Sequence, residues 1–298
     1  QHPASGNYTF EHVKGCEIEG TDKSQFNIVL EKARASDIII VAIGEHKDLS
    51  GEAASKTMIR IPGVQEDLLK ALKATGKPII TIVMNGRPLI LNEVEMNSDA
   101  ILEAWWLGTQ AGNALSDIIY GDYNPSGKLP MSFPRHEGQI PIYYNHKNTG
   151  RPLNPTDKYT TKYIDAPNTP LYSFGYGLSY TTFTYSTPMT SKASFSDADQ
   201  VTISVNVSNT GNFDGEEVVQ LYIRDLVASV TRPVKELKAF KKLMIKKGET
   251  KKVEFVLSKN DFEFYDQNMV KTTEAGEFHI FVGSNSDTTN KTSVFLTK

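Results

Sequence analysis

Two hydrophobic patterns alternate in the first part of the chain. Some segments are short apolar runs, as in strands of a parallel sheet that are buried on both faces. Others repeat apolar residues at helical spacing, with Gly76 and Gly121 placed where helix C-caps are expected. The predicted strands are 13–18, 37–44, 78–84 and 100–106, and the predicted helices are 26–33, 64–75 and 111–119. This alternation predicts an α/β layer built on a parallel sheet.

From Gln200 onward the period of the pattern becomes two. Residues 201–207 alternate valine or isoleucine with polar residues, and the segments 219–223, 253–257 and 278–282 alternate in the same way. Turn signals lie between these segments, which predicts an all-β sandwich of about one hundred residues. The segment 205–211, followed by Asp214 and Gly215, resembles a strand and turn of a fibronectin type III-like domain.

Between these two regions lies a stretch rich in proline, glycine, asparagine and tyrosine, without helical spacing. Its many aromatic residues favour an ordered connector over a flexible one, because aromatic side chains bury large areas when they pack. We therefore expect an α/β sandwich domain over residues 1–135, an ordered connector over 136–186 and a fibronectin type III-like domain over 187–298.

Charge and composition narrow the classes of function. The chain has 32 basic and 35 acidic residues and a net charge of −3, which argues against a nucleic-acid partner. No apolar run reaches the length of about 20 residues that a membrane span needs. Cys16 is the single cysteine, so neither an internal disulfide nor a cysteine-based zinc cluster is expected. We expect no cofactor and no metal.

Polar loops follow three of the predicted strands, and ligands of open parallel sheets bind beyond the carboxyl ends of the strands. The first loop, 44–52, is long and holds Glu45, Asp48 and Glu52. A glutamate there can protonate a leaving group if partial burial raises its pKa. The alternative for all three carboxylates is a solvated acidic loop, and the position in the sequence alone favours that alternative.

Four further residues of these three loops are candidates for substrate binding. Trp105 and Trp106 are able to stack on a sugar ring, although packing at a strand end is the more common role of such residues. His46 and Arg87 are candidates for the polar rim of a site or for structural hydrogen bonds.

The sequence does not satisfy several motifs that define other classes of protein. Residues 121–129 are similar to a phosphate-binding loop, but the spacing is one residue too long, Leu129 replaces the serine or threonine, and Pro130 follows where a helix is required. A flavodoxin-like nucleotide-binding protein is therefore disfavoured. The six histidines form no HExxH pair, which disfavours a zinc hydrolase.

Longer strings resemble family 3 of the glycoside hydrolases. Two carry the resemblance to the family, and three more are similar to its branch of periplasmic bacterial β-glucosidases. The first two are residues 121–134 (GDYNPSGKLPMSFP) and 172–183 (YSFGYGLSYTTF), and the others are 137–146 (EGQIPIYYNH), 148–152 (NTGRP) and 230–240 (VTRPVKELKAF). The resemblance runs from about Ser36 to the C-terminus.

This resemblance implies a (β/α)8 barrel, then an α/β sandwich, then a fibronectin-like domain. It implies retaining hydrolysis of β-glycosides, with a nucleophilic aspartate on the barrel and an acid/base carboxylate on the sandwich domain. Residues 50–56 (SGEAASK) resemble the acid/base loop, with Glu52 at the position of the acid/base, although Lys56 stands where the family often has arginine. We expect the barrel and the first sandwich strand to be absent from this chain, which would then be inactive alone.

The resemblance also implies the partners: a β-glucoside or oligosaccharide substrate, the missing N-terminal barrel, and a second copy of the chain as a candidate homodimer partner. It implies a periplasmic or secreted location. Two alternatives stay open. One is a non-catalytic module that binds carbohydrate or a protein partner, and the other is a β-xylosidase of the same family.

Overall fold

The computed structural model describes residues 8–196 and 198–297, which form two compact units. The first unit comprises the described residues up to Asp122 together with Phe133–Pro141. Its elements are α1 (Phe26–Ala35), β1 (Ile39–Gly44), the 3-10 helix η1 (Lys47–Leu49), α2 (Gln65–Lys73), β2 (Ile79–Met84), α3 (Asn92–Asn97), β3 (Ala100–Glu103), the 3-10 helix η2 (Gly108–Gln110), α4 (Ala111–Tyr120) and the 3-10 helix η3 (Glu137–Gln139).

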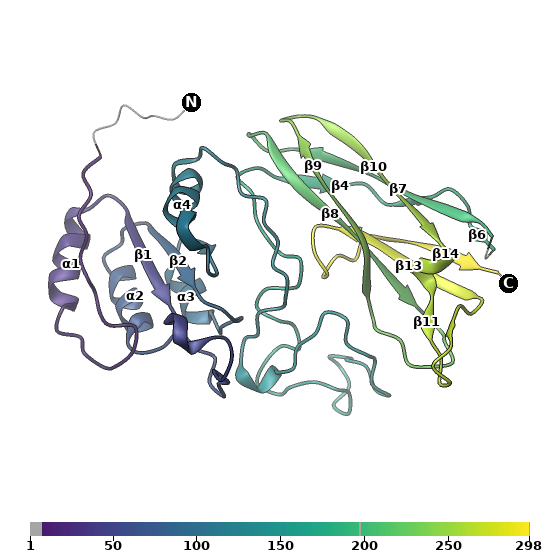
Figure 1. The fold of residues 1–298 in the computed structure, drawn as a ribbon, viewed down its shortest axis with the longest axis horizontal. Coiled ribbons are helices and arrows are strands. Elements are labelled where there is room, and N and C mark those ends of the chain that lie inside the picture. The colour runs from purple at the N-terminus through teal and green to yellow at the C-terminus, as the bar shows by residue number, and fades with distance from the viewer. Residues whose placement is uncertain (1–7, 197, 298) are drawn as a thin grey trace. The chain divides into compact units, whose positions relative to one another are not determined.

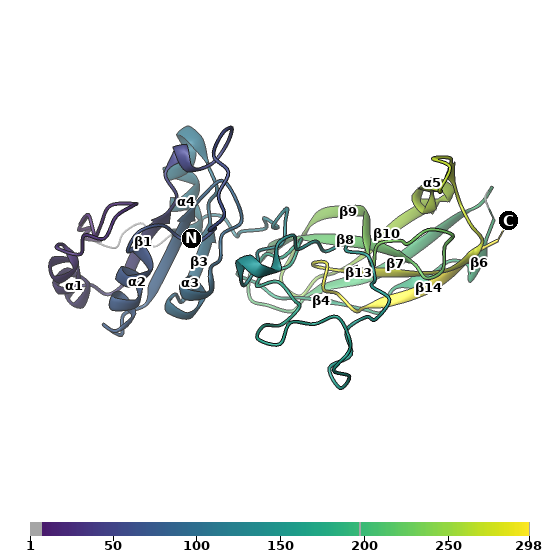
Figure 2. The same ribbon diagram turned by 90° about the horizontal axis from the view of Figure 1, so that it is seen from below.

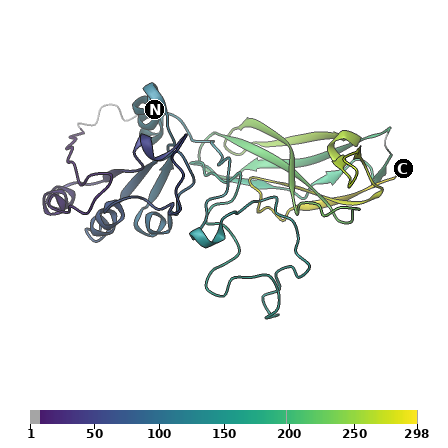
Figure 3. The same ribbon diagram turned by 60° about the horizontal axis from the view of Figure 1, so that its bottom comes forward.

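The first unit is built on a three-stranded parallel sheet in the order β1-β2-β3. Helices α1, α2 and α3 lie along one face of this sheet and α4 lies on the other (Figures 2 and 3). Leu69, Leu72, Ile79 and Val83 are almost inaccessible to solvent, because α2 buries its apolar face against the sheet. In α2, acidic residues occupy the first turn and lysines the last, which complements the helix dipole.

The strand predicted at residues 13–18 is wrong, since no strand forms there. A short alternating run does not by itself determine that a strand forms or which strand it would pair with. This segment packs across α2 instead. Gly15 lies against the side chain of Leu68, and the carbonyl of Ile18 accepts a 3.0 Å hydrogen bond from the side chain of Gln65. The predicted strand 100–106 ends early, at Glu103, while helix α3 was missed because its six residues are too short to show a period.

The second unit comprises Tyr123–Ser132 and the described residues from Ile142 onward. Its elements are β4 (Phe183–Tyr185), β5 (Met189–Thr190), β6 (Ser194–Phe195), β7 (Gln200–Asn209), β8 (Gly215–Asp225), β9 (Glu236–Ile245), β10 (Thr250–Ser258), α5 (Lys259–Phe262), β11 (Phe264–Tyr265), β12 (Lys271–Thr272), β13 (Gly276–Gly283) and β14 (Lys291–Leu296). The main strands form a sheet in the order β10-β7-β4 and a second in the order β6-β14-β13-β8-β9 (Figure 1).

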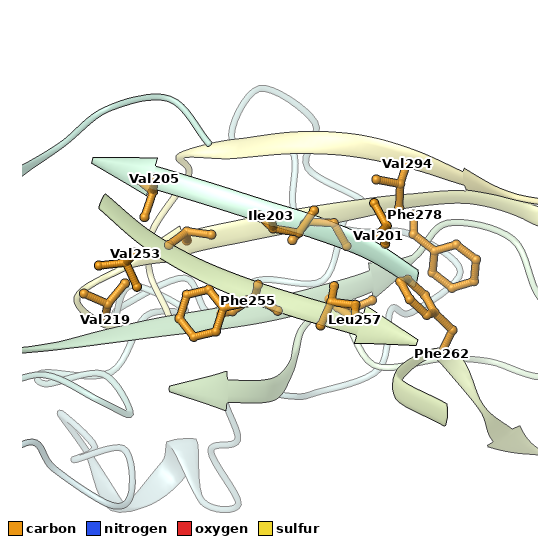
Figure 4. Close-up of a cluster of buried hydrophobic side chains, with 14 of the residues drawn as sticks. Val201, Ile203, Val205, Val219, Val253, Phe255, Leu257, Phe262, Phe278 and Val294 are labelled. Carbon is orange, nitrogen blue, oxygen red and sulfur yellow. The ribbon is translucent and has the colours of Figure 1, made fainter. Parts of the chain in front are cut away.

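The two sheets of the second unit enclose one apolar core. Alternate residues of β7 and β10 point into it, including Val201, Ile203, Phe255 and Leu257 (Figure 4). Val256, between two of these, is 58% exposed. The predicted class, a parallel α/β layer followed by an all-β sandwich, is therefore confirmed.

Residues 142–180 run outside the two sheets of the second unit as an irregular chain (Figure 3). Side-chain contacts with the rest of the second unit hold this segment in place. Tyr144 stacks on Phe174 with ring centroids 4.3 Å apart, its hydroxyl accepts a hydrogen bond from the backbone N–H of Leu237, and Lys128 donates to the carbonyl of Gly177. The domain boundaries predicted at residues 135 and 186 stay a prediction.

No helix among the described residues is both long enough and apolar enough to span a membrane.

Candidate functional site

The carboxyl ends of all three strands of the first unit meet at one edge of the sheet. The parallel register pairs Gly44 with Met84 and Val83 with Glu103, so the loops after β1, β2 and β3 begin side by side. This edge is where open parallel sheets bind ligands. It carries every side chain that the sequence nominated.

The end of β1 is fixed by a glycine and a glutamine. Gly44 has φ +147°, and a Cβ there would lie 1.8 Å from the carbonyl oxygen of Met84, so a larger residue does not fit. The buried Gln65, first residue of α2, exchanges two hydrogen bonds with the backbone of Gly44, at 2.9 and 2.8 Å. The direction in which the next loop leaves the sheet is therefore set by packing.

Glu52 lies in a tight turn of that loop. The N–H of Ala54 donates to the carbonyl of Gly51 at 3.3 Å, and Ala53 has φ +57°. Glu52 is thus the second residue of a β-turn whose third residue is left-handed, as in type II turns. Its side chain is exposed, and within residues 8–196 and 198–297 it has neither a hydrogen bond nor an ion pair. The carboxylate is therefore accessible to a ligand.

Beneath this turn lies a buried carboxylate, Glu45, the residue directly after β1. Its Oε1 is 3.2 Å from the Nζ of Lys56 and its Oε2 is 3.4 Å from the Nε of Arg87. A buried carboxylate needs such partners, since its desolvation otherwise costs several kcal/mol. Lys56 lies four residues after Glu52, so this ion pair links the first residue of the loop to a residue beyond the turn.

Arg87, on the loop after β2, is hydrogen-bonded to the loop of Glu52. Its Nη2 donates to the carbonyls of Leu49 and Ala54, the latter at 2.8 Å. These two carbonyls flank the turn that holds Glu52. The sequence makes Arg87 a candidate for substrate binding, and in the structure its side chain is hydrogen-bonded to the protein.

The two tryptophans lie differently. The ring of Trp105 packs on the buried Phe133, with centroids 5.7 Å apart, and the residue is left-handed with φ +47°. Trp106 is 44% exposed. A Cβ on Gly86 would lie 2.1 Å from the Oγ of Ser50 and 2.5 Å from the Nε1 of Trp106, so the loops after all three strands converge at this glycine. Trp106 is therefore beside the loop of Glu52, whereas the half-buried Trp105 packs on Phe133, and a role of either in substrate binding stays a prediction.

A second acidic residue, Glu103, ends β3 and is mostly buried. Burial raises the pKa of Glu103 from 4.5 to about 8, against the opposing effects of the N–H of Trp105 and the amide of Asn85. The N–H of Trp105 donates to its Oε1 at 3.3 Å, while its Oε2 and the Oδ1 of Asn85 have no partner. A proton on Glu103 would supply the donor that these oxygens lack.

His46 caps η1, and its Nδ1 accepts from the N–H of Asp48 at 3.4 Å. It is an exposed residue with a local structural contact. Across the described part of the chain, no group of three or more histidine, cysteine, aspartate or glutamate side chains is placed to hold a metal ion.

Sequence reasoning missed the roles of the supporting residues Asn85 and Glu103, and it named Glu45 only as a candidate catalytic carboxylate. All three follow or end an apolar run directly, and an ionisable or amide group in that position is the available signal of burial at a strand end. Gln65 gave no signal, because nothing in the pattern links the start of α2 to the end of β1.

Comparisons with known proteins identify the family to which the chain belongs. The profile of the glycosyl hydrolase family 3 C-terminal domain matches residues 4–180, and the profile of a fibronectin type III-like domain matches residues 217–286. The strand-end site and the sandwich thus lie in regions typical of glycoside hydrolases. The first match covers more than half of the chain, so this chain belongs to glycoside hydrolase family 3.

Individual relatives agree with this assignment. The chain is 50% identical over 259 residues to a protein of Salmonella typhimurium named periplasmic beta-glucosidase, covering 86% of this chain and 34% of that protein. It is 40% identical over 290 residues to a beta-xylosidase of Formosa agariphila, covering 96% of this chain and 39% of the relative.

A solved structure is similar as well. The crystal structure of a beta-glucosidase from Listeria innocua in complex with glucose superposes with a TM-score of 0.90 at 40% identity, covering 95% of this chain and 40% of the other. The chain therefore spans about a third to two-fifths of the length of these relatives.

The raised pKa of Glu103 predicts a pH dependence of stability. Between about pH 4.5 and 8 the folded chain holds a proton that the unfolded chain has lost, so this contribution is complete below pH 4.5 and is lost as the pH rises to 8. Glu103→Gln, which cannot ionise, should flatten the fall in unfolding free energy across this range. Both tryptophans of the chain lie beside this residue, so urea unfolding followed by tryptophan fluorescence reports on the first unit. An equal slope in the variant and the parent chain would contradict the assignment.

Proposed function

We propose that this chain is the C-terminal part of a retaining β-glucosidase and supplies its acid/base carboxylate, Glu52. The observation that carries the proposal is the turn of residues 51–54, which presents an exposed carboxylate without a partner at the carboxyl edge of the sheet. Membership in glycoside hydrolase family 3 supports the reaction class. The nucleophile would come from a barrel domain of the longer enzyme, which is the partner that completes the site.

The proposed chemistry has two steps. Glu52 first donates its proton to the glycosidic oxygen while the carbon–oxygen bond breaks and the nucleophilic carboxylate bonds to the anomeric carbon. The Glu52 carboxylate then takes a proton from the water that attacks the same carbon. This second attack releases the sugar and the nucleophile and restores the acid. The two carboxyl groups act on opposite faces of the sugar, so both faces must be accessible. A turn at the edge of a unit that is separate from the barrel permits this access.

The terminal sugar is proposed to be β-D-glucose, because relatives from Salmonella typhimurium and Listeria innocua carry the name beta-glucosidase. A second candidate is β-D-xylose, favoured by the beta-xylosidase of Formosa agariphila, which matches almost the whole chain. Rates with nitrophenyl β-glucoside and nitrophenyl β-xyloside in the full-length enzyme distinguish the two. The name of the Salmonella relative also supports a periplasmic or secreted location.

Removal of Glu52 tests the acid/base role. In the full-length enzyme, Glu52→Ala should lower kcat/KM by roughly 10²- to 10⁴-fold for aryl β-glucosides with poor leaving groups. Substrates with good leaving groups should be cleaved in the first step without the acid, and added azide should then restore turnover by attacking the glycosyl–enzyme intermediate.

Asp48→Ala is the matched control, because Asp48 is an exposed carboxylate of the same loop. It should leave turnover within about twofold of the parent enzyme, as is usual for a surface change. Unchanged cleavage by Glu52→Ala, with no effect of azide, would show that the acid/base lies elsewhere. A larger loss in Asp48→Ala would move the role to that residue.

The purified 298-residue chain is predicted to have no glycosidase turnover alone, because it would hold one of the two carboxyl groups. The assay is nitrophenol release from aryl β-glucosides by the chain and by the full-length enzyme at equal concentration. Robust hydrolysis by the chain would refute the division of the site. Binding of oligosaccharides without hydrolysis, seen by calorimetry, would instead support the non-catalytic module.

A further inference from the structure

The backbone on both sides of Glu52 is held by one side chain from another loop. The Nη2 of Arg87 donates to the carbonyl of Leu49, three residues before Glu52, and to that of Ala54, two residues after it. Leu49 and Ala54 also donate their own N–H groups within the loop, to the carbonyls of His46 and Gly51. The guanidinium therefore links the short helix η1 to the turn.

The guanidinium also pairs with the buried carboxylate of Glu45. The carboxylate lies between the Nε of Arg87 and the Nζ of Lys56, at 3.4 and 3.2 Å, and its contact with Arg87 is an ion pair without a hydrogen bond. Glu45 is buried at the end of β1, where its backbone N–H donates to the carbonyl of Met84 at 2.8 Å. Glu45, at the end of β1, thus pairs with two cations: Arg87, which is hydrogen-bonded to the turn, and Lys56, four residues after Glu52.

The backbone conformation of the turn is unfavourable unless its surroundings support it. Ala53, with φ +57°, occupies a backbone region that residues other than glycine adopt at a cost, and such residues persist when their surroundings hold them. The side chain of Glu52 makes no described contact of its own. The position of its carboxylate therefore depends on the backbone that Arg87 holds.

We propose that Arg87 is a positioning residue for Glu52, and that Glu45 orients Arg87 and Lys56 for this task. The proposal assigns Arg87 to the protein rather than to the substrate and rests on the proposed role of Glu52. The guanidinium is required because its planar fork donates several hydrogen bonds in fixed directions, which a lysine ammonium does not reproduce.

The first experiment needs no activity. Hydrogen exchange of residues 46–56 is measured by mass spectrometry in the 298-residue chain, for the parent and for Arg87→Lys. The lysine keeps the positive charge beside Glu45 but loses the fork, so exchange of this loop should become about tenfold faster or more, as expected for two lost hydrogen bonds.

Arg60→Lys is the control. Arg60 makes a two-point contact with Glu137 in the same unit, at 2.9 and 3.1 Å, and bonds neither carbonyl of the turn. It should leave the exchange of residues 46–56 unchanged. If Arg87→Lys does not fold, Glu45→Gln, which keeps the shape of the side chain, replaces it with the same expected result. Parent-like exchange in the folded variant overturns the proposal.

The second experiment uses the full-length enzyme and separates positioning from general damage. Arg87→Lys should lower kcat/KM about tenfold or more for aryl β-glucosides with poor leaving groups, and less than about threefold for those with good leaving groups, because only the former need a well-placed acid. An equal loss for both overturns the positioning role. If Glu52→Ala proves silent, the proposed function fails, while the exchange experiment still decides whether Arg87 holds the turn.

Discussion

The ion pairs of Glu45 are the interaction on which the candidate site depends. A carboxylate buried at the end of a strand is costly unless cations compensate it, and here the two cations come from different loops, Arg87 from the loop after β2 and Lys56 from the loop after β1. Neutralising this charge therefore brings the two loops together. The same contact places the Arg87 fork against the backbone around Glu52.

The edge of the sheet combines this ionic centre with backbone strain. Ala53 and Trp105 are left-handed residues on two of the converging loops, and Gly86 leaves the space in which Ser50 and Trp106 approach each other. Strained residues gather at functional sites when the surrounding structure holds them in place. The arrangement leaves Glu52 as the exposed acidic group of the turn, while Glu103, at the end of β3, lies in a buried environment that favours its neutral form.

The sequence was most informative where the pattern was long. The periods of 3.6 and 2 located most of the helices and long strands, because these signals extend over many residues. The assignment of Glu52 rests on the short match of residues 50–56 to the acid/base loop of the family, and it stays a prediction. The short helix α3, the strand predicted at 13–18 and the end of β3 were missed or wrong because few residues decide them. The role of Arg87 was not predictable, since it depends on two backbone carbonyls more than thirty residues away in the chain.

If Glu52 is one of the two carboxyl groups of a retaining site, it must face the nucleophile across the sugar. A crystal structure of the full-length enzyme with its nucleophile trapped by a 2-deoxy-2-fluoroglucoside measures this directly. We expect the carboxyl group of Glu52 to lie about 5–5.5 Å from the trapped carboxylate, on the other side of the anomeric carbon. A separation beyond about 10 Å, or a different carboxyl group at the predicted distance, would contradict it.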